Sequence, residues 1–436
     1  YIQGYQNEKE ELGEKQLQDT IEKLKQEYRK KDCVILYFIG LTESYEGEGY
    51  DRKNLKIPQN QEELLAEIAE TVGKDHIAAI SFGGAPMDFS FEKNVGAILH
   101  MYLGGQAVGE SVADLISGEV NPSGKLAETI PFSEKDTPAW RYFAPPNDDV
   151  EYRESIFVGY RYYETFHVPV KYPFGYGLSY TSFSYSELNV PEVYSGGKIQ
   201  IRFKIKNIGK VSGAEIAQLY ICPIESDVIR SHIELKGFQK IYLHPGEEKE
   251  VILELDERSF SVYDVEKKAF SMLSGKYQIC IGASVHDLQL KANMEVVGNS
   301  YFRNERELFP DYFREQPHGM EISAEQFYQL LGGEPKHDKE KKRGEYTVYD
   351  SYQDVVNVSM FGKFVRGVVH IGLKIMLRGK SERDPAFKMV KMGVEEGNLE
   401  GLIATSGGIA TPKLIDMLVY NANKKYLQAF KRLLKK

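Results

Sequence analysis

Residues 34–40 read Val-Ile-Leu-Tyr-Phe-Ile-Gly, a continuous apolar run that ends at a glycine. Such a run predicts a strand that is buried on both faces, as in a parallel sheet with helices on either side. Apolar runs also precede Gly-Gly pairs, and segments with helical spacing lie between them. The runs are 77–82 and 96–103, and the helical segments are 16–31, 58–72 and 107–117. Strand and helix alternate, so residues 1–135 are predicted to form an α/β domain with a mostly parallel sheet.

The pattern changes after this domain. Residues 136–190 are rich in Pro, Gly and aromatic residues without a clear period, which predicts a compact connector rather than a flexible linker. Residues 191–297 contain short alternating runs separated by turn signals such as His-Pro-Gly-Glu at 244–247. Regular short strands of this kind indicate an antiparallel β-sandwich.

Residues 298–436 form a C-terminal extension with a charged segment and predicted helices, most clearly over 412–434. Its Lys-rich end is typical of a solvated helix face, with contact to an acidic partner as the alternative. The predicted fold class is therefore α/β plus all-β, followed by a mainly helical tail.

Composition excludes several classes of protein. The net charge of −9 argues against nucleic acid as a partner. Cys33, Cys222 and Cys280 are widely spaced without a CxxC pair, so neither a disulfide framework nor a zinc site is expected. No apolar run approaches the roughly 18 residues of a membrane span, so no membrane partner is expected. We expect a cytoplasmic location, but the first residue is Tyr1 rather than Met, which leaves secretion open.

The loop after the first apolar run contains Glu-Gly-Glu-Gly-Tyr-Asp-Arg at 46–52. Open α/β sheets bind ligands at the carboxyl ends of their strands, which is where this loop lies. Gly47 and Gly49 allow backbone angles that other residues avoid, so Glu48 can project from a tight bend. Neighbouring carboxylates, and a substrate that excludes water, would raise the pKa of Glu48 toward that of a general acid.

The next residues of this loop, Asp51 and Arg52, could pair and hold its shape. From the spacing alone, a solvated acidic loop is the alternative interpretation. A calcium loop does not fit, because the D-x-[DN]-x-[DN]-G spacing is missing. Residues 104–109, Gly-Gly-Gln-Ala-Val-Gly, precede a helix but lack the signatures of a phosphate or dinucleotide site, so close packing is the favoured interpretation. The tyrosines of the connector could stack on sugar, but packing between domains is favoured for them.

These segments, in this order, resemble the C-terminal half of glycoside hydrolase family 3, the β-glucosidase type. The resemblance covers about residues 1–295 closely and the extension more weakly. It implies a partial α/β sandwich domain over 1–135 and a fibronectin type III-like domain over 191–297. The motifs that carry it are the acidic loop, Tyr-Leu-Gly-Gly-Gln at 102–106, Gly-Glu-Val-Asn-Pro-Ser-Gly-Lys-Leu at 118–126, Phe-Val-Gly-Tyr-Arg-Tyr-Tyr at 157–163, Pro-Phe-Gly-Tyr-Gly-Leu-Ser-Tyr at 173–180 and Glu-Leu-Lys-Gly-Phe at 234–238.

The resemblance implies retaining hydrolysis of terminal, non-reducing β-D-glucosyl residues. The acid/base glutamate of the family corresponds to Glu48. The aspartate nucleophile of the family belongs to a preceding barrel domain, in a Ser-Asp-Trp motif. The only tryptophan here is Trp140, in Pro-Ala-Trp-Arg, so that motif is absent and no nucleophile is expected in this chain.

The resemblance further implies that no organic cofactor or metal is needed. The implied partners are a β-glucoside or oligosaccharide substrate and a missing N-terminal barrel, and a homo-oligomer is compatible with these properties. The residues that bind substrate are not identified by the sequence. We expect a fragment of a retaining β-glucosidase that is nearly inactive alone. The alternatives are a non-catalytic carbohydrate-binding or assembly module, or a fragment of a β-xylosidase or other exo-glycosidase.

Overall fold

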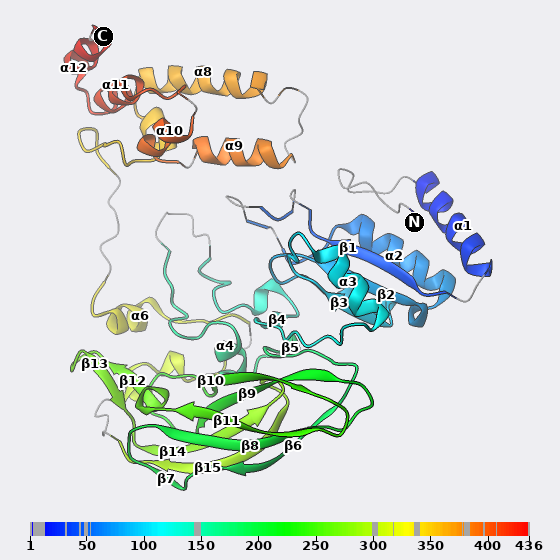
Figure 1. Ribbon diagram of the computed structural model, residues 1–436. Helices are drawn as coiled ribbons and strands as arrows, with labels where there is room; N and C mark the ends of the chain where they lie inside the picture. The colour runs from blue at the N-terminus through cyan, green and yellow to red at the C-terminus, as the bar shows by residue number, and fades with distance from the viewer. Residues whose placement is uncertain are drawn as a thin grey trace. The chain divides into compact units, whose positions relative to one another are not determined.

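The computed structural model describes residues 2, 14–30, 33–42, 45–47, 51–52, 54–143, 150–298, 304–316, 318–334, 341–376, 378, 384–395, 397–406 and 408–434. These residues form two compact units (Figure 1). The larger unit holds the described residues of 15–38 and 55–334, and the smaller unit holds those of 39–54 and 341–434.

An α/β domain opens the chain. Its sheet has the order β1-β2-β3, and β2 and β3 run parallel. Its strands and helices are α1 (Glu14–Lys30), β1 (Ile35–Gly40), α2 (Gln59–Val72), β2 (Ile77–Phe82), β3 (Ala97–His100) and α3 (Val108–Ser117). Helix α2 starts after Pro58, a residue suited to a helix N-terminus because it has no amide hydrogen to leave unpaired. The domain therefore has the predicted alternation of strand and helix.

Strand β1 differs from its prediction. Tyr37 and Ile39 are buried, but Leu36 is 40% and Phe38 is 51% exposed. The strand lies at the edge of the sheet, and the Tyr37 hydroxyl donates to the backbone oxygen of Gln61 in α2 at 2.7 Å. The prediction that this strand is buried on both faces is therefore wrong, because successive side chains point to opposite faces and only one face of β1 is covered.

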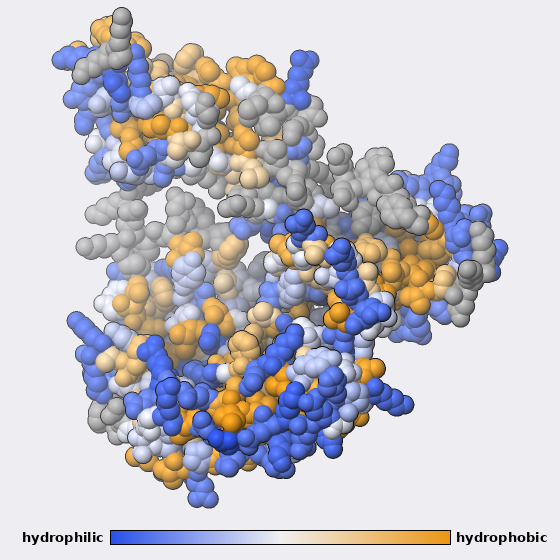
Figure 2. Space-filling view, in the orientation of Figure 1, coloured by the Kyte–Doolittle hydropathy of each residue, from blue (hydrophilic) through white to orange (hydrophobic). Residues whose placement is uncertain are grey.

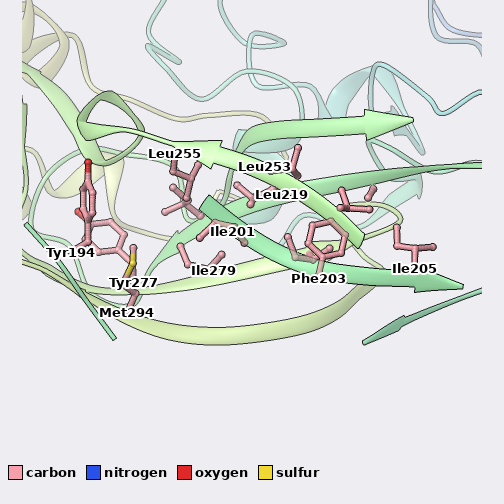
Figure 3. Close-up of a cluster of buried hydrophobic side chains, with 14 of the residues drawn as sticks. Tyr194, Ile201, Phe203, Ile205, Leu219, Leu253, Leu255, Tyr277, Ile279 and Met294 are labelled. Carbon is pink, nitrogen blue, oxygen red and sulfur yellow. The ribbon is translucent and has the colours of Figure 1, made fainter. Parts of the chain in front are cut away.

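The β-sandwich packs two sheets, with strand orders β10-β9-β14-β15-β7 and β11-β8-β6. Alternate residues of β8 and β11 point inward, where Ile201, Phe203 and Leu255 are at most 1% exposed (Figure 3). Its strands are β6 (Phe183–Asn189), β7 (Val193–Tyr194), β8 (Ile199–Asn207), β9 (Gly213–Pro223), β10 (Glu234–Leu243), β11 (Glu248–Leu255), β14 (Gly275–Gly282) and β15 (Leu288–Val296). Strands β12 (Ser261–Asp264) and β13 (Ala269–Met272) form a separate two-stranded sheet. The apolar interior explains why this part of the chain folds as a layered unit.

The cysteines of the sandwich lie closer together than their spacing in the chain indicates. Cys222 in β9 and Cys280 in β14 are buried, and their Sγ atoms are 3.8 Å apart. Both thiols are free, as is that of Cys33, which is only half-buried. Cys280 thus packs as a small buried hydrophobic residue, whereas Cys33, which also lies in an apolar run, does not.

The connector folds around its aromatic residues and around a segment that follows the sandwich. Phe157 and Tyr162 pack with Phe309 and Tyr312, all at most 1% exposed. The Tyr162 hydroxyl donates to the backbone oxygen of Gln316 at 2.7 Å, and burial raises the pKa of Tyr162 to about 12. The elements involved are β4 (Ile130–Pro131), α4 (Tyr160–Thr165), β5 (Val170–Tyr172), α5 (Glu305–Leu308) and α6 (Ala324–Leu331). The first part of the predicted extension thus belongs to the larger unit.

The smaller unit contains a group of short helices. Apolar side chains of α7, α8, α10 and α11 form its core, among them Val355, Val365, Leu399 and Ile415. The helices are α7 (Tyr352–Asn357), α8 (Met360–Met376), α9 (Pro385–Glu395), α10 (Leu399–Thr405), α11 (Pro412–Ala422) and α12 (Tyr426–Leu434). Among the helices within the described residues, none is both long enough and apolar enough to cross a bilayer.

The helical pattern over 412–434 is interrupted in the structure. Asn423 lies between α11 and α12, and its Oδ1 accepts from the backbone nitrogens of Gly344 and Tyr346 at 2.9 and 3.0 Å. Lys424 follows with φ of +59°, a left-handed conformation that ends a helix. Residues 412–434 therefore form two helices and not one. The hydrogen bonds from the loop at Gly344 and Tyr346 to Asn423 hold the residue at which the helical pattern is interrupted.

Asn121 joins three parts of the larger unit. Its Oδ1 accepts from Ser179 Oγ at 3.0 Å and from the Tyr180 backbone nitrogen at 2.8 Å, both in the connector. Its Nδ2 donates to the backbone oxygen of Ser212 at 3.1 Å, in the sandwich. From the last turn of the α/β domain, one amide thus satisfies partners in both the connector and the sandwich.

Replacement of this amide is expected to destabilise the larger unit. Asn121→Ala leaves up to three polar groups without their partner, so we expect the free energy of unfolding to fall by about 1–3 kcal/mol. Urea denaturation followed by circular dichroism measures it. Asn189→Ala, at an exposed position of β6, is the control and should change the free energy by less than about 0.5 kcal/mol. Equal effects of the two substitutions would contradict the bridging role of Asn121.

Candidate active site

The acidic loop follows β1 directly. Within it, the backbone nitrogens of Tyr45 and Glu46 donate to the Thr42 oxygen at 2.8 and 3.0 Å, which forms a turn just before the acidic motif. Glu48, the predicted acid/base, lies outside the described residues. Its position is therefore defined here by sequence alone, immediately after this turn.

The predicted support of the loop is only partly visible. Asp51 is exposed and Arg52 is half-buried. Among the described residues, no ion pair joins their side chains, although Arg52 does have an interaction partner. A role of Asp51 and Arg52 in holding the loop stays a prediction.

A polar cluster lies where β2 and β3 end. Ser81 Oγ and His100 Nδ1 are 2.9 Å apart, within hydrogen-bond distance. Strands β2 and β3 are parallel, with Ser81 opposite His100, so both side chains lie at the carboxyl edge of the sheet. Burial lowers the pKa of His100 to about 4, so its imidazole is neutral at neutral pH. This pair is not predicted from the sequence, although polar residues at the ends of two apolar runs are a signal for it.

Tyr102 extends the polar cluster beyond β3. Its ring centroid lies 4.1 Å from that of His100. Burial and the nearby carboxylate of Glu128 raise the pKa of its hydroxyl. The backbone of Tyr102 has φ of +49°, which is unusual for a residue with a large side chain and is typical of functional loops.

The glycine-rich segment after Tyr102 is shaped by packing. A Cβ atom added to Gly104 would overlap Val108 Cγ2, at the first residue of α3. Gly105 has φ of +71°, which favours glycine. The segment therefore lets α3 start close to the sheet edge, in agreement with the close packing predicted for it.

The connector contributes a second polar group near the sheet. Tyr172 donates to Glu92 Oε2 at 2.6 Å, and Lys171 pairs with the same carboxylate. The rings of Tyr172 and Tyr176 stack with centroids 5.5 Å apart, and the ring of Phe89 packs edge-on against Tyr172. Of the other connector tyrosines, Tyr160, Tyr162 and Tyr163 are buried, whereas Tyr152 and Tyr180 are exposed.

No metal centre is formed by these groups. The part of the chain that the structure describes holds no set of three or more His, Cys, Asp or Glu side chains arranged to bind a metal ion. The arrangement offers neutral hydrogen-bonding groups, His100, Tyr102 and Ser81, at the carboxyl edge of the sheet. Such an edge can orient a polar ligand and move protons, and carbohydrate is one ligand class that it suits.

Comparison with known proteins identifies two domains of the chain. Residues 2–180 match the glycosyl hydrolase family 3 C-terminal domain, and residues 215–285 match the fibronectin type III-like domain. The fold and these matches define two domains that occur in a family of glycoside hydrolases. The chain belongs to glycoside hydrolase family 3, of which it carries the C-terminal α/β domain and the fibronectin type III-like domain.

Similar proteins include enzymes with more than one named activity. Thermostable beta-glucosidase B of Acetivibrio thermocellus is 41% identical over 298 residues, which cover 68% of this chain and 38% of the relative. An exo-alpha-(1->6)-L-arabinopyranosidase of Bifidobacterium breve is 37% identical over 273 residues, 63% of this chain and 36% of that protein. The chain therefore spans less than half the length of these relatives.

Solved structures show the same fold. A family 3 beta-glucosidase of Bifidobacterium adolescentis superposes with a TM-score of 0.64 at 35% identity, over 68% of this chain and 43% of the other. Beta-glucosidase 3B of Thermotoga neapolitana, in complex with alpha-D-glucose, superposes with a TM-score of 0.58 at 34% identity, over 64% of this chain and 39% of the other. The predicted fold class and family are thus confirmed.

The half-buried imidazole of His100 makes stability depend on pH. The unfolded chain protonates His100 near pH 6.5, whereas the folded chain keeps it neutral down to about pH 4. The unfolded state binds more protons between these values, so the free energy of unfolding should fall as the pH is lowered from about 6.5 to about 4, by at most about 1.4 kcal/mol per pH unit. Denaturation at several pH values measures this slope. His100→Gln should reduce it and the exposed control His244→Gln should not, and an unchanged slope in His100→Gln would refute the assignment.

Proposed function

We propose that this chain takes part in the retaining hydrolysis of terminal, non-reducing β-D-glucosyl residues and supplies the general acid/base, Glu48. The observation that carries the proposal is the match of residues 2–180 to the family 3 C-terminal domain, because this range contains the acidic loop. The named β-glucosidase activity of several similar proteins supports the choice of sugar.

The proposed reaction has two steps and uses two carboxyl groups. In the first step a carboxylate nucleophile attacks the anomeric carbon while protonated Glu48 gives its proton to the leaving glycosidic oxygen. This step forms a covalent glycosyl–enzyme ester and releases the alcohol. In the second step Glu48, now a carboxylate, takes a proton from water, and the resulting attack on the anomeric carbon releases the sugar and restores both groups.

The nucleophile of this scheme comes from outside the 436 residues of the sequence. The sequence has no Ser-Asp-Trp motif, since Trp140 follows Pro-Ala. We therefore propose a barrel domain that carries such an aspartate as the functional partner of this chain. No metal or organic cofactor takes part in the proposed chemistry, which needs only acid, base and nucleophile.

A different exo-glycosidase activity is the second candidate. The similarity to an exo-alpha-(1->6)-L-arabinopyranosidase favours it, because this enzyme, named for another sugar, contains a segment that is 37% identical to this chain. A β-xylosidase belongs to the same candidate class. A non-catalytic carbohydrate-binding or assembly module is the alternative without chemistry, and the assay below distinguishes it.

The acid/base assignment is tested with a barrel supplied. The chain is expressed together with a family 3 barrel domain that carries Ser-Asp-Trp, and hydrolysis of aryl β-glucosides, β-xylosides and arabinopyranosides is measured. Glu48→Ala should lower kcat by about 10²–10⁴ because the proton donor is lost. Added azide should restore turnover and yield a glycosyl azide, since azide attacks the covalent intermediate without needing a base.

The matched control is Glu46→Ala, a carboxylate of the same loop, which should retain most activity. Full turnover by Glu48→Ala would exclude the acid/base role. Rapid hydrolysis by the chain without a barrel would show that a nucleophile is present after all. Absence of activity in the complemented wild type, together with retained sugar binding, would favour the non-catalytic module.

A further inference from the structure

Helix α8 exposes an apolar stripe on the surface of the smaller unit. Its inner side, with Phe361, Val365 and Val369, belongs to the core of that unit. Five large apolar side chains recur every three or four residues on another side, which places them on one line along the helix. They are Met360 (91% exposed), Phe364 (68%), Val368 (54%), Ile371 (60%) and Ile375 (69%).

Helix α12 carries a similar exposed surface. Ala429 is its buried residue, and Arg432 Nε pairs with Asp416 Oδ2 of α11 at 2.8 Å. Helix α11 contacts both α8 and α12, so the three belong to one packed group. The exposed apolar residues of α12 are Tyr426, Leu427, Phe430, Leu433 and Leu434. Orange surface in the region of α8 and α12 is visible in Figure 2.

Basic residues border the stripe of α8. Lys363 and Lys374 are exposed, lie about three turns apart and so project on the same side of the helix. Neither forms an ion pair with another residue of the described chain. Arg366 is also exposed, and α8 contains no Asp or Glu. Lys and Arg outnumber Asp and Glu by two to one in residues 341–436, although the whole chain has a net charge of −9.

We propose that α8, assisted by α12, docks the smaller unit onto an anionic lipid surface. An exposed helix with large apolar residues on one side and lysines beside them fits the boundary between acyl chains and negatively charged headgroups. The apolar stripe enters the boundary region, and Lys363 and Lys374 meet the headgroup phosphates. The helix lies in the plane of the surface and does not span it, which agrees with the absence of a membrane-crossing helix among the described residues.

A second copy of this chain fits the stripe less well. In a two-fold dimer the same patch meets itself, so the lysines of one α8 would approach those of the other. No acid on α8 is available to neutralise them, and such like-charge contact opposes association. An anionic bilayer supplies apolar and negative groups together, so the charge pattern favours lipid.

This inference departs from the expectation that no membrane partner is involved. That expectation rested on the absence of a spanning run, and the composition of α8 alone does not reveal which apolar residues the core leaves uncovered. The proposal does not depend on the proposed hydrolytic function, because it is argued from α8 and α12 and not from the acidic loop.

Sedimentation with vesicles tests the proposal on the full chain. We expect binding to vesicles of phosphatidylcholine mixed with phosphatidylglycerol, weaker binding as salt is raised, and little binding to phosphatidylcholine alone. Phe364→Glu/Ile371→Glu should weaken binding to anionic vesicles by at least about tenfold. Lys363→Glu/Lys374→Glu should weaken it as well. Phe238→Glu, at a 66% exposed position of β10, is the control and should bind as the wild type does.

Three outcomes would overturn the proposal. They are absence of binding to anionic vesicles, equal binding to both vesicle types, and unchanged binding by the two double variants. Analytical ultracentrifugation of the wild type and of Phe364→Glu/Ile371→Glu accompanies the assay. A wild-type dimer that the substitution dissociates would assign the stripe to a second copy instead. All substituted positions are exposed, so the variants are expected to fold, and thermal unfolding checks this for each of them. If Phe364→Glu/Ile371→Glu does not fold, Lys363→Glu/Lys374→Glu still tests the proposal.

Discussion

The larger unit depends on the burial of aromatic rings between the connector and a segment that follows the sandwich. Phe157 and Tyr162 lie in a connector that has little regular secondary structure of its own. Their rings are buried in one cluster with Phe309 and Tyr312, and large aromatic side chains gain much from such burial. Each buried hydroxyl finds a backbone acceptor, Tyr162 at Gln316 and Tyr312 at Arg153, so polarity is satisfied as well. The connector between the α/β domain and the sandwich therefore has a packed core of its own.

The predictions made from the sequence succeeded where the pattern is local. The alternation along β8 and β11, and the turn at 244–247 that separates β10 from β11, can be recognised without knowledge of the other strands. Prediction failed where the outcome depends on distant neighbours. The apolar run of β1 does not reveal an edge position, and helical periodicity over 412–434 does not reveal that Asn423 binds the loop at Gly344 and Tyr346. The strand register that brings Cys222 beside Cys280 is likewise invisible in their spacing.

The candidate site shows the same division in a stronger form. Glycine and acid spacing placed Glu48 on a loop, but a solvated bend explains that spacing equally well. The assignment of a chemical role came from resemblance of a whole series of motifs, and the matched family domain now contains that loop. The pair Ser81 and His100 had no such motif, because the contact across two parallel strands arises only when the sheet forms. Electrostatic properties such as the low pKa of His100 follow from burial and could not be anticipated either.

The hydrogen bond from Tyr162 to Gln316 also has a consequence for the order of events during synthesis. The two residues are 154 positions apart, and Tyr142 reaches Ile322 over 180 positions. The whole sandwich is translated between them. Because the chain leaves the ribosome from its N-terminus, the aromatic rings of the connector remain exposed to solvent until the residues after the sandwich have been synthesised. The packing of the connector against residues 309–322 is therefore a late step of folding that closes a long loop. The sheets of the sandwich end at Val296, so the sandwich can form before this step.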